Sequence, residues 1–278
     1  MTADAAELAA LVAEVARGSA YQQITPELIE HVGRIEMGKR RTLKEAVKAT
    51  KSRLHQVAGA YATRRQQTAW LDALRDARAE GPAALRSACE GIMHAHASTR
   101  ERLPLLDTFY QRTLGALAPV GSVLDLACGL NPLTIPWMPL SPGARYEALD
   151  IYLDMAAFLN DALPMLGVAG HAEACDLTLR PPERSAEVAL LLKAIPCLDH
   201  IERDAGLRLL DAAPARHVLV SYPAQSLGGR RSGRVAHYDA RFEALLAQRP
   251  WQAERFEFAT EIAWLVAKGA IASSSLAQ

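Results

Sequence analysis

The sequence predicts an α/β fold, in which an all-helical N-terminal domain precedes a mostly parallel β-sheet with an antiparallel edge strand. Two observations carry this prediction. Up to about residue 117 the apolar residues recur at helical spacing and no segment resembles a strand. From Ser122 onward, short apolar runs alternate with helical segments, which is typical of a parallel sheet. We place the domain boundary between residues 95 and 96, giving domains of residues 1–95 and 96–278.

The N-terminal part divides into six expected helices. Pro26 and Pro82 each suit the first turn of a helix, where proline's missing amide hydrogen costs nothing. The expected helices span residues 5–17, 26–33, 43–61, 64–79, 82–96 and 102–117. We expect the last of them to pack on the sheet.

Seven apolar runs supply the expected strands. They are VLDLA (123–127), YEALD (146–150), HAEACD (171–176), EVALLLKA (187–194), HVLVSYP (217–223), WQAERFEF (251–258) and EIAWLVAKG (261–269). The last two are expected to pair as an antiparallel hairpin at the sheet edge. Between the fifth and sixth runs we expect a mobile loop that extends through Gly233 and Arg234.

Composition narrows the class of protein. The chain has 278 residues, 50% of them hydrophobic, and a formal net charge of zero, so it supports a packed core and by itself indicates no nucleic-acid partner. No apolar stretch approaches a membrane span, and the acidic N-terminus lacks the basic start of a secretion signal, so we expect a cytoplasmic protein. The four cysteines lack C-x-x-C spacing, which argues against a metal site and a disulfide framework.

The segment VLDLACGLNPLTIP (123–136) is the most informative motif. An apolar strand containing Asp125 ends at Ala127, and Gly129 lets the chain turn tightly where parallel sheets bind ligands. The segment has neither the G-x-G-x-x-G of dinucleotide folds nor the G-x-x-x-x-G-K-[ST] of triphosphate-binding loops. D-x-x-C-G instead resembles motif I of S-adenosylmethionine-dependent methyltransferases. An ordinary α/β turn remains the alternative.

Two acids follow at suitable positions. Asp150 ends the second expected strand, 21 residues after Gly129, and an acid there can bind ribose hydroxyls. Asp176 follows the third strand, where an acid commonly faces the adenine amino group and Leu177 can cover the ring. Either aspartate could instead cap a helix or close a turn.

The segment after the fourth strand bears on the acceptor. Lys193 lies where many methyltransferases place their substrate-facing motif, but ALLLKAIPCLD is not the N/D-P-P-Y tetrad of amino methylation. An aromatic ring nitrogen needs no such tetrad, because its lone pair lies in the ring plane and no proton has to leave. Alignment with the methyl group would then be the main contribution, and we expect no catalytic base.

Basic residues gather in two places. Lys44, Lys48 and Lys51 fall on one face of a helix, and such a stripe could neutralise phosphates, although a solvated helix face has the same pattern. The basic residues expected to bind RNA in this part are Lys39, Arg40, Arg41, Lys44, Lys48, Lys51, Arg64 and Arg65. Near residue 230, glycines mixed with Arg230 and Arg231 suit phosphate contact, or form a plain surface loop.

Taken together, these motifs resemble one family: the aminoglycoside-resistance 16S rRNA methyltransferases that modify N7 of guanine 1405. The matching segments are HASTRERLPLLDTFY, LDLACGLNPLTIP, ALDI, LLLKAIPCL and VSYPAQSLGGR, in the family's order. The resemblance covers essentially the whole chain. It implies a Rossmann-like methyltransferase domain, S-adenosylmethionine as cofactor, and a helical domain that docks on 16S rRNA in the assembled 30S subunit.

The resemblance also implies roles for individual residues. Thr99 and Arg102 would hold the methionine carboxylate of the cofactor, with Arg102 using its guanidinium fork. The expected cofactor-binding residues are Thr99, Arg102, Asp125, Ala127, Gly129, Asp150, Ile151, Asp176, Leu177 and Lys193. The residues expected to contact rRNA outside the helical domain are Ser221, Tyr222, Arg230 and Arg231. Family members often read D-I-D where this chain has Asp150-Ile151-Tyr152, so the contact of the second acid is either missing or replaced by one from Asp154.

The expected activity is methylation of guanine 1405 at N7 by a monomer without metal, which gives aminoglycoside resistance. Three other readings stay open. The chain could methylate a small molecule, bind the ribosome with a relict cofactor pocket, or methylate adenine at N1 at the neighbouring position. The small-molecule reading leaves the basic helices without a purpose, and enzymes of the adenine class generally lack the helical domain and the STRERL segment.

Overall fold

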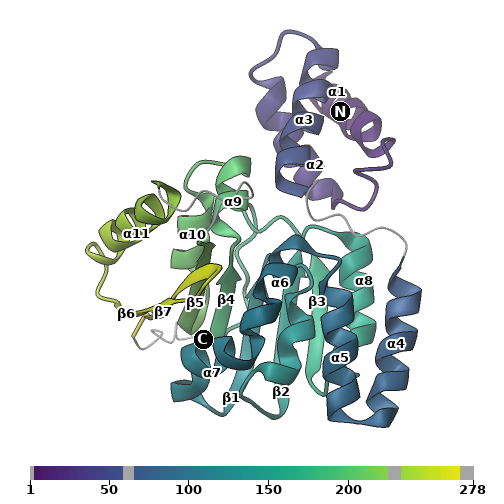
Figure 1. Cartoon of the computed structure of the whole chain (residues 1–278). Coiled ribbons are helices and arrows are strands. Elements are labelled where there is room, and N and C mark those ends of the chain that lie inside the picture. Colours follow the sequence, from purple (N-terminus) through teal and green to yellow (C-terminus); the bar gives the residue numbers. More distant parts are fainter. Residues whose placement is uncertain (1–2, 59–65, 225–232, 270–278) are drawn as a thin grey trace, which may run out of the picture.

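The computed structural model describes residues 3–58, 66–224 and 233–269. They form a seven-stranded sheet in the order β3-β2-β1-β4-β5-β7-β6 (Figure 1). The strands are β1 (Val120–Leu126), β2 (Leu140–Asp150), β3 (Ala169–Ala174), β4 (Ala186–Leu192), β5 (Ala215–Pro223), β6 (Gln252–Glu257) and β7 (Glu261–Ala267). Neighbours among β1–β5 run parallel, and β7 is antiparallel to both β5 and β6. The predicted sheet and its antiparallel edge are confirmed.

Helices cover both faces of the sheet, because the central strands are apolar on both sides. Val188 and Leu190 of β4 belong to one core cluster, whereas Ala189 and Leu191 belong to the other. The first face is covered by α4 (Gln67–Glu80), α5 (Pro82–Met93), α7 (Leu106–Leu114) and α8 (Leu153–Ala162), and the second by α9 (Ile195–Ile201), α10 (Ala205–Ala212) and α11 (Gly233–Leu246). The result is a three-layer α/β/α domain.

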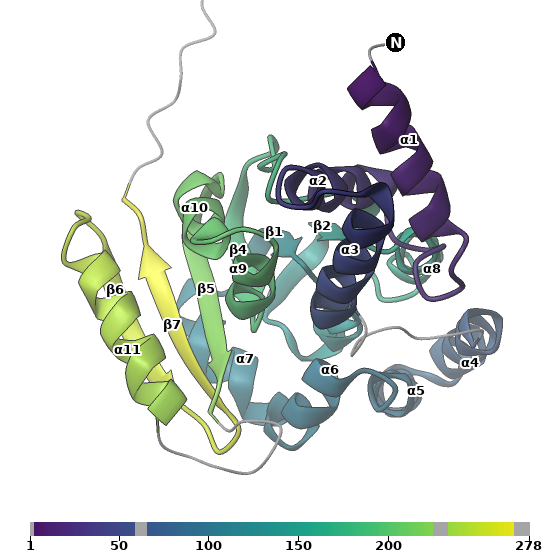
Figure 2. The ribbon, with the colours of Figure 1, turned by 90° about the horizontal axis from the view of Figure 1, so that it is seen from above.

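The first three helices form a group of their own above the sheet (Figure 1). They are α1 (Ala3–Ala16), α2 (Pro26–Met37) and α3 (Leu43–Ala58), and each contacts the other two. Seen from above, α2 and α3 lie over the sheet near β1 and β2 (Figure 2). In contrast, α4 and α5 contact each other, α8 and the 3-10 helix η3 (Asn131–Trp137). The division at residues 95 and 96 stays a prediction.

Two local predictions were wrong. Where one helix was expected over residues 102–117, α6 (Ala97–Arg102) ends at Arg102 and is followed by η1 (Leu103–Leu105), α7 and η2 (Gly115–Leu117), because Pro104 disfavours continuous α-helix around it. The expected loop through Arg234 ends earlier, since α11 begins at Gly233. Tyr238, Phe242 and Leu245 stand at i, i+4 and i+7, a helical period that was missed.

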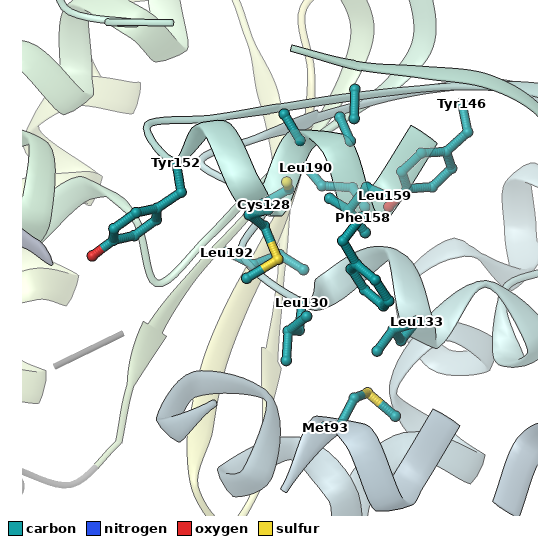
Figure 3. Close-up of a cluster of buried hydrophobic side chains, with 14 of the residues drawn as sticks. Met93, Cys128, Leu130, Leu133, Tyr146, Tyr152, Phe158, Leu159, Leu190 and Leu192 are labelled. Atoms are coloured by element: carbon teal, nitrogen blue, oxygen red, sulfur yellow. The ribbon is translucent and has the colours of Figure 1, made fainter. Parts of the chain in front are cut away.

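Buried apolar side chains from both the sheet and its helices support the turn after β1 (Figure 3). Met93 of α5, Phe158 and Leu159 of α8, and Leu133 of η3 belong to one buried cluster. Cys128, which belongs to that turn, lies in the same cluster. Within the described ranges, no helix is long and apolar enough to cross a membrane.

Candidate cofactor pocket

A pocket opens where β1, β2 and β4 end, beneath α3. This is the edge of a parallel sheet at which ligands bind, because every strand delivers a turn there. The residues that line it are Val57, His96, Ser98, Arg102, Asp125, Ala127, Cys128, Gly129, Asn131, Asp150, Ile151, Tyr152, Met155, Asp176, Leu177, Leu192, Lys193, Ala194, Cys197, Leu198 and Ile201. Nine of the ten expected cofactor-binding residues are therefore together, and Thr99 is not among them.

The turn after β1 adopts an unusual backbone. Gly129 has φ of 51°, and Ala127 has φ of 54°, in the left-handed region that residues with a Cβ rarely occupy. A Cβ at Gly129 would lie 2.9 Å from the His96 ring, so glycine is required for space as well as for conformation. Lys193, after β4, is left-handed too, with φ of 58°. Such strained residues cluster at functional sites, and these three all line the pocket.

The acid at the end of β2 holds this turn. Asp150 Oδ2 accepts a hydrogen bond from the Gly129 amide at 2.7 Å, and Oδ1 accepts one from the Ile151 amide at 2.7 Å. Burial nonetheless raises the pKa of Asp150, because these amide bonds only partly replace water. A ligand hydroxyl that donates to this carboxylate would therefore stabilise its charged form.

Asp125, inside β1, is the centre of a buried polar network. Its Oδ2 accepts hydrogen bonds from Asn131 Nδ2 at 2.9 Å and from the Tyr146 hydroxyl at 2.6 Å. Burial raises its pKa to about 6, against the opposing effect of these two bonds. The Tyr110 hydroxyl in turn donates to Asn131 Oδ1 at 2.8 Å, which ties α7 to the same network.

Glu261, the first residue of β7, was missed in the sequence and holds the cations of the site. The guanidinium of Arg102 donates to Glu261 through Nε at 3.0 Å and Nη2 at 2.6 Å, and the ammonium of Lys193 lies 3.6 Å away. Burial alone would raise the pKa of Glu261. The two cations lower it by more than burial raises it, so the net shift is downward. An acid opening an apolar strand, E-I-A-W-L-V-A, was the available signal.

This pairing bears on the expected role of Arg102. Its Nη1 donates to Asn131 Oδ1 at 2.7 Å, so all three guanidinium nitrogens have partners within the protein. Lys193 likewise donates to Glu101 at 2.8 Å. The geometry therefore shows the fork on Glu261 rather than open to a ligand, because a guanidinium that is 1% exposed needs a buried counter-charge. Its contact with the cofactor carboxylate stays a prediction.

Three other residues expected to contact the cofactor or the rRNA do not line the pocket. The Thr99 hydroxyl donates to the Met93 carbonyl at 2.8 Å, inside the helical layer. Ser221 is fully buried, and its hydroxyl donates to Glu261. Tyr222 is 3% exposed and stacks on Tyr238 with ring centroids 4.5 Å apart. Because β5 directs Tyr222 into the core under α11, its ring offers no face to RNA in this structure.

The N-terminal helices reach the pocket through Asp176. Asp176 Oδ2 lies 2.7 Å from Nδ1 of His31 on α2, and the Asp176 amide donates to Glu27 of the same helix at 3.1 Å. Tyr152, in the position where the family often has an acid, is buried and forms an antiparallel bridge with Ile24. Sequence spacing offered no signal for His31, since a lone histidine in a helix is unremarkable.

The basic residues of the N-terminal helices differ in their surroundings. Arg41, Lys44 and Lys48 are exposed and form no ion pair with any described residue. Lys39 and Arg40 pair with the buried Glu36, and Lys51 lies 3.9 Å from Glu14. The remaining expected RNA contacts, Arg64, Arg65, Arg230 and Arg231, lie outside the described residues.

The charges around the pocket fit S-adenosylmethionine. Three carboxylates, those of Asp125, Asp150 and Asp176, line it, whereas its two cations are already held by glutamates. A ligand that brings hydroxyl and amino donors and a positive sulfonium suits this set. Among the described residues, no cluster of histidine, cysteine or acidic side chains could hold a metal ion.

The sheet order and this pocket define a Rossmann-like, S-adenosylmethionine-dependent methyltransferase. Residues 17–265 match the family model described as ribosomal RNA methyltransferase (FmrO). The chain belongs to this family.

Relatives and solved structures agree with that assignment. The chain is 39% identical over 258 residues to a 16S rRNA (guanine(1405)-N(7))-methyltransferase of Frankia casuarinae, covering 91% of this chain and 90% of the relative. An enzyme of the same name from Micromonospora echinospora is 34% identical, with 91% and 94% covered. The crystal structure of the 16S rRNA methyltransferase RmtF in complex with S-adenosyl-L-homocysteine aligns with a TM-score of 0.78 at 30% identity, covering 95% and 98%.

Proposed function

We propose that this chain methylates N7 of guanine 1405 of 16S rRNA in the assembled 30S subunit, and thereby gives resistance to aminoglycosides. The observation that supports it best is the position of α3. This helix carries the exposed Lys44 and Lys48 on its surface and contributes Val57 to the cofactor pocket. Lys44 and Lys48 precede Val57 by roughly 14–20 Å along the helix axis, so RNA phosphates held on α3 would bring neighbouring nucleotides to the side of the protein on which the pocket lies. Relatives that carry this activity in their names match over most of the chain.

The reaction requires only that guanine N7 and the methyl group be held in line. S-adenosylmethionine would supply an electrophilic methyl group, to which the N7 lone pair of guanine would bond as the carbon–sulfur bond breaks and the sulfur keeps its electrons. The guanine ring would then carry the positive charge, and no proton would have to leave. Asp150 would hold the ribose, Asp176 and Leu177 would bind the adenine, and Gly129 would lie beneath the cofactor.

The base would be flipped out of the rRNA into this site, at a cost of a few kcal/mol offset by backbone contacts. We place docking on residues 1–95 and catalysis on residues 96–278, in a monomer in the cytoplasm.

The positive charge of methylated N7 would repel a cationic aminoglycoside at the decoding site, which explains the resistance.

Primer extension on 16S rRNA from cells that express the chain tests the proposal. After borohydride and aniline treatment, which cleaves at N7-methylguanine, we expect a stop at guanine 1405. A stop at a neighbouring adenine without that treatment would indicate methylation at N1 instead. Unmodified 16S rRNA in cells that contain the folded protein would contradict the proposal, and labelled methyl transfer to metabolites would then favour a small-molecule enzyme.

A further inference from the structure

The contact between His31 and Asp176 joins the N-terminal helices to the cofactor pocket. The two residues are 145 positions apart in sequence, and His31 Nδ1 lies 2.7 Å from Asp176 Oδ2. The exposed fraction is 10% for the side chain of His31 and 1% for that of Asp176, so water competes little for this contact. An ionised carboxylate can only accept, so a hydrogen bond to the charged form of Asp176 requires the form of His31 that carries a hydrogen on Nδ1.

Most of the hydrogen-bond acceptor positions of the Asp176 carboxylate are already used within the protein. Its Oδ1 accepts hydrogen bonds from the Thr178 amide at 2.9 Å and from the Thr178 hydroxyl at 2.6 Å. A carboxylate has about four acceptor positions, and His31 takes a third. About one position is left, on Oδ2, and Asp176 lines the pocket. That position can accept one hydrogen from an exocyclic amino group.

The neighbouring contacts hold the same strand ends. The Thr25 amide donates to the Ile151 carbonyl at 2.8 Å, and the Leu153 amide donates to the Gln23 carbonyl at 2.7 Å. Glu27 accepts from the Asp176 amide. Residues 23–31 therefore fix the ends of β2 and β3, at which Asp150 and Asp176, two of the three acids of the pocket, are located.

We propose that His31 is a positioning residue of the cofactor site. By occupying one side of Oδ2, it turns the remaining acceptor position of Asp176 toward the adenine amino group. This inference rests on the proposed adenine-binding role of Asp176. It makes the helical part of the chain, which carries the basic face of α3, a component of cofactor binding as well as of RNA docking.

Calorimetry with two ligands tests the proposal. S-adenosylhomocysteine carries the adenine amino group, and S-inosylhomocysteine has a carbonyl oxygen in its place. His31→Leu removes the donor, and we expect it to weaken binding of the adenosyl ligand about tenfold and to leave the inosyl ligand within about twofold. His31→Asn places an amide nitrogen near the position of Nδ1 and should recover most of the affinity. His171→Ala, at an exposed histidine on β3, should change neither.

The outcomes distinguish a failure of the His31 inference from a failure of the proposed cofactor site. Equal weakening of both ligands would assign His31 a merely structural role, and unchanged binding of the adenosyl ligand by His31→Leu would also overturn the inference. If Asp150→Ala and Asp176→Ala lose that ligand while His31→Leu keeps it, only the inference fails. If the two aspartate variants keep it as well, the proposed cofactor site fails. His31→Ala serves as a second donor-free variant if circular dichroism shows His31→Leu unfolded.

Discussion

The carboxylate of Asp150 is held by backbone amides, and no cation of the described residues pairs with it. Asp150→Ala removes the acceptor expected for the ribose hydroxyls and releases the Gly129 amide. We expect the affinity for S-adenosylhomocysteine, measured by calorimetry, to fall at least tenfold, or about 1.4 kcal/mol. Asp161→Ala, at an exposed aspartate of α8, is the matched control. Unchanged affinity in Asp150→Ala would remove Asp150 from the cofactor site.

The raised pKa of the Asp125 carboxyl group predicts that the stability of the protein depends on pH. Its pKa is raised from 3.8 to about 6 in the folded protein, so the folded state holds the proton more tightly than the unfolded state. The free energy of unfolding should therefore fall as the pH rises from about 4 to about 6, by at most about 3 kcal/mol, and the loss should persist above that range.

The difference between the wild type and Asp125→Asn isolates this contribution. Urea unfolding of both proteins at several pH values should show the slope in the wild type and a flatter profile in Asp125→Asn. Asp161 is exposed, so the control variant Asp161→Asn should keep the wild-type slope. Parallel profiles for the wild type and Asp125→Asn would show that Asp125 titrates normally.

The sequence predicted those residues whose position follows from their place on a strand. Asp150 ends β2, Asp176 follows β3 and Gly129 follows β1, so the parallel sheet brings them together. His31 and Glu261 could not be found in this way. Their partners lie 145 and 159 residues away, and nothing in local spacing encodes which distant side chain a buried charge will meet.

At the scale of elements, two helical glycines offer a matched pair. A Cβ on Gly206 of α10 would lie 2.8 Å from the backbone Cα of Ile195 in α9, so Gly206→Ala should separate the helices and destabilise the protein by about 1–3 kcal/mol. A Cβ on Gly91 of α5 would meet nothing within 4 Å.

Gly91→Ala should therefore stabilise the protein by about 0.5–1 kcal/mol, because alanine favours the helix. The free energy of unfolding in urea measures both changes. Equal effects of the two substitutions would mean that helix propensity alone decides, and that the close contact between α9 and α10 relaxes without cost.

The predicted elements were right where apolar periodicity was long and wrong where it was interrupted. All seven strands were found, although β2 begins at Leu140 rather than at Tyr146 and β6 buries only Phe256. The helix over residues 102–117 was overextended across Pro104, and the start of α11 was hidden by the glycines and arginines before it. In both cases turn-forming residues sit inside or beside a helix, and local composition gave the wrong boundary.

At the scale of the whole molecule, RNA docking and cofactor binding should be separable at the surface. Replacing Lys44, Lys48 and Lys51 by glutamate reverses the charge of the α3 face, and we expect binding to 30S subunits to weaken at least tenfold and to depend less on salt. Affinity for S-adenosylhomocysteine should stay unchanged, because these side chains do not line the pocket.

Arg75→Glu on α4 is the control for this experiment, because Arg75 is exposed and pairs with Asp72. Filter binding at several salt concentrations measures the RNA side, and calorimetry measures the cofactor side. If the triple variant lost only cofactor affinity, the basic face would have no role in docking.

The contact between His31 and Asp176 also bears on the order in which the protein folds during its synthesis. A ribosome that makes this chain adds about 5–20 residues per second, and 145 residues separate the two partners. The face of α2 that will close over the pocket therefore emerges on the order of ten seconds before the strand ends that it covers. During that interval the first three helices depend on their own small core, and the completed cofactor site is among the last features of the molecule to assemble.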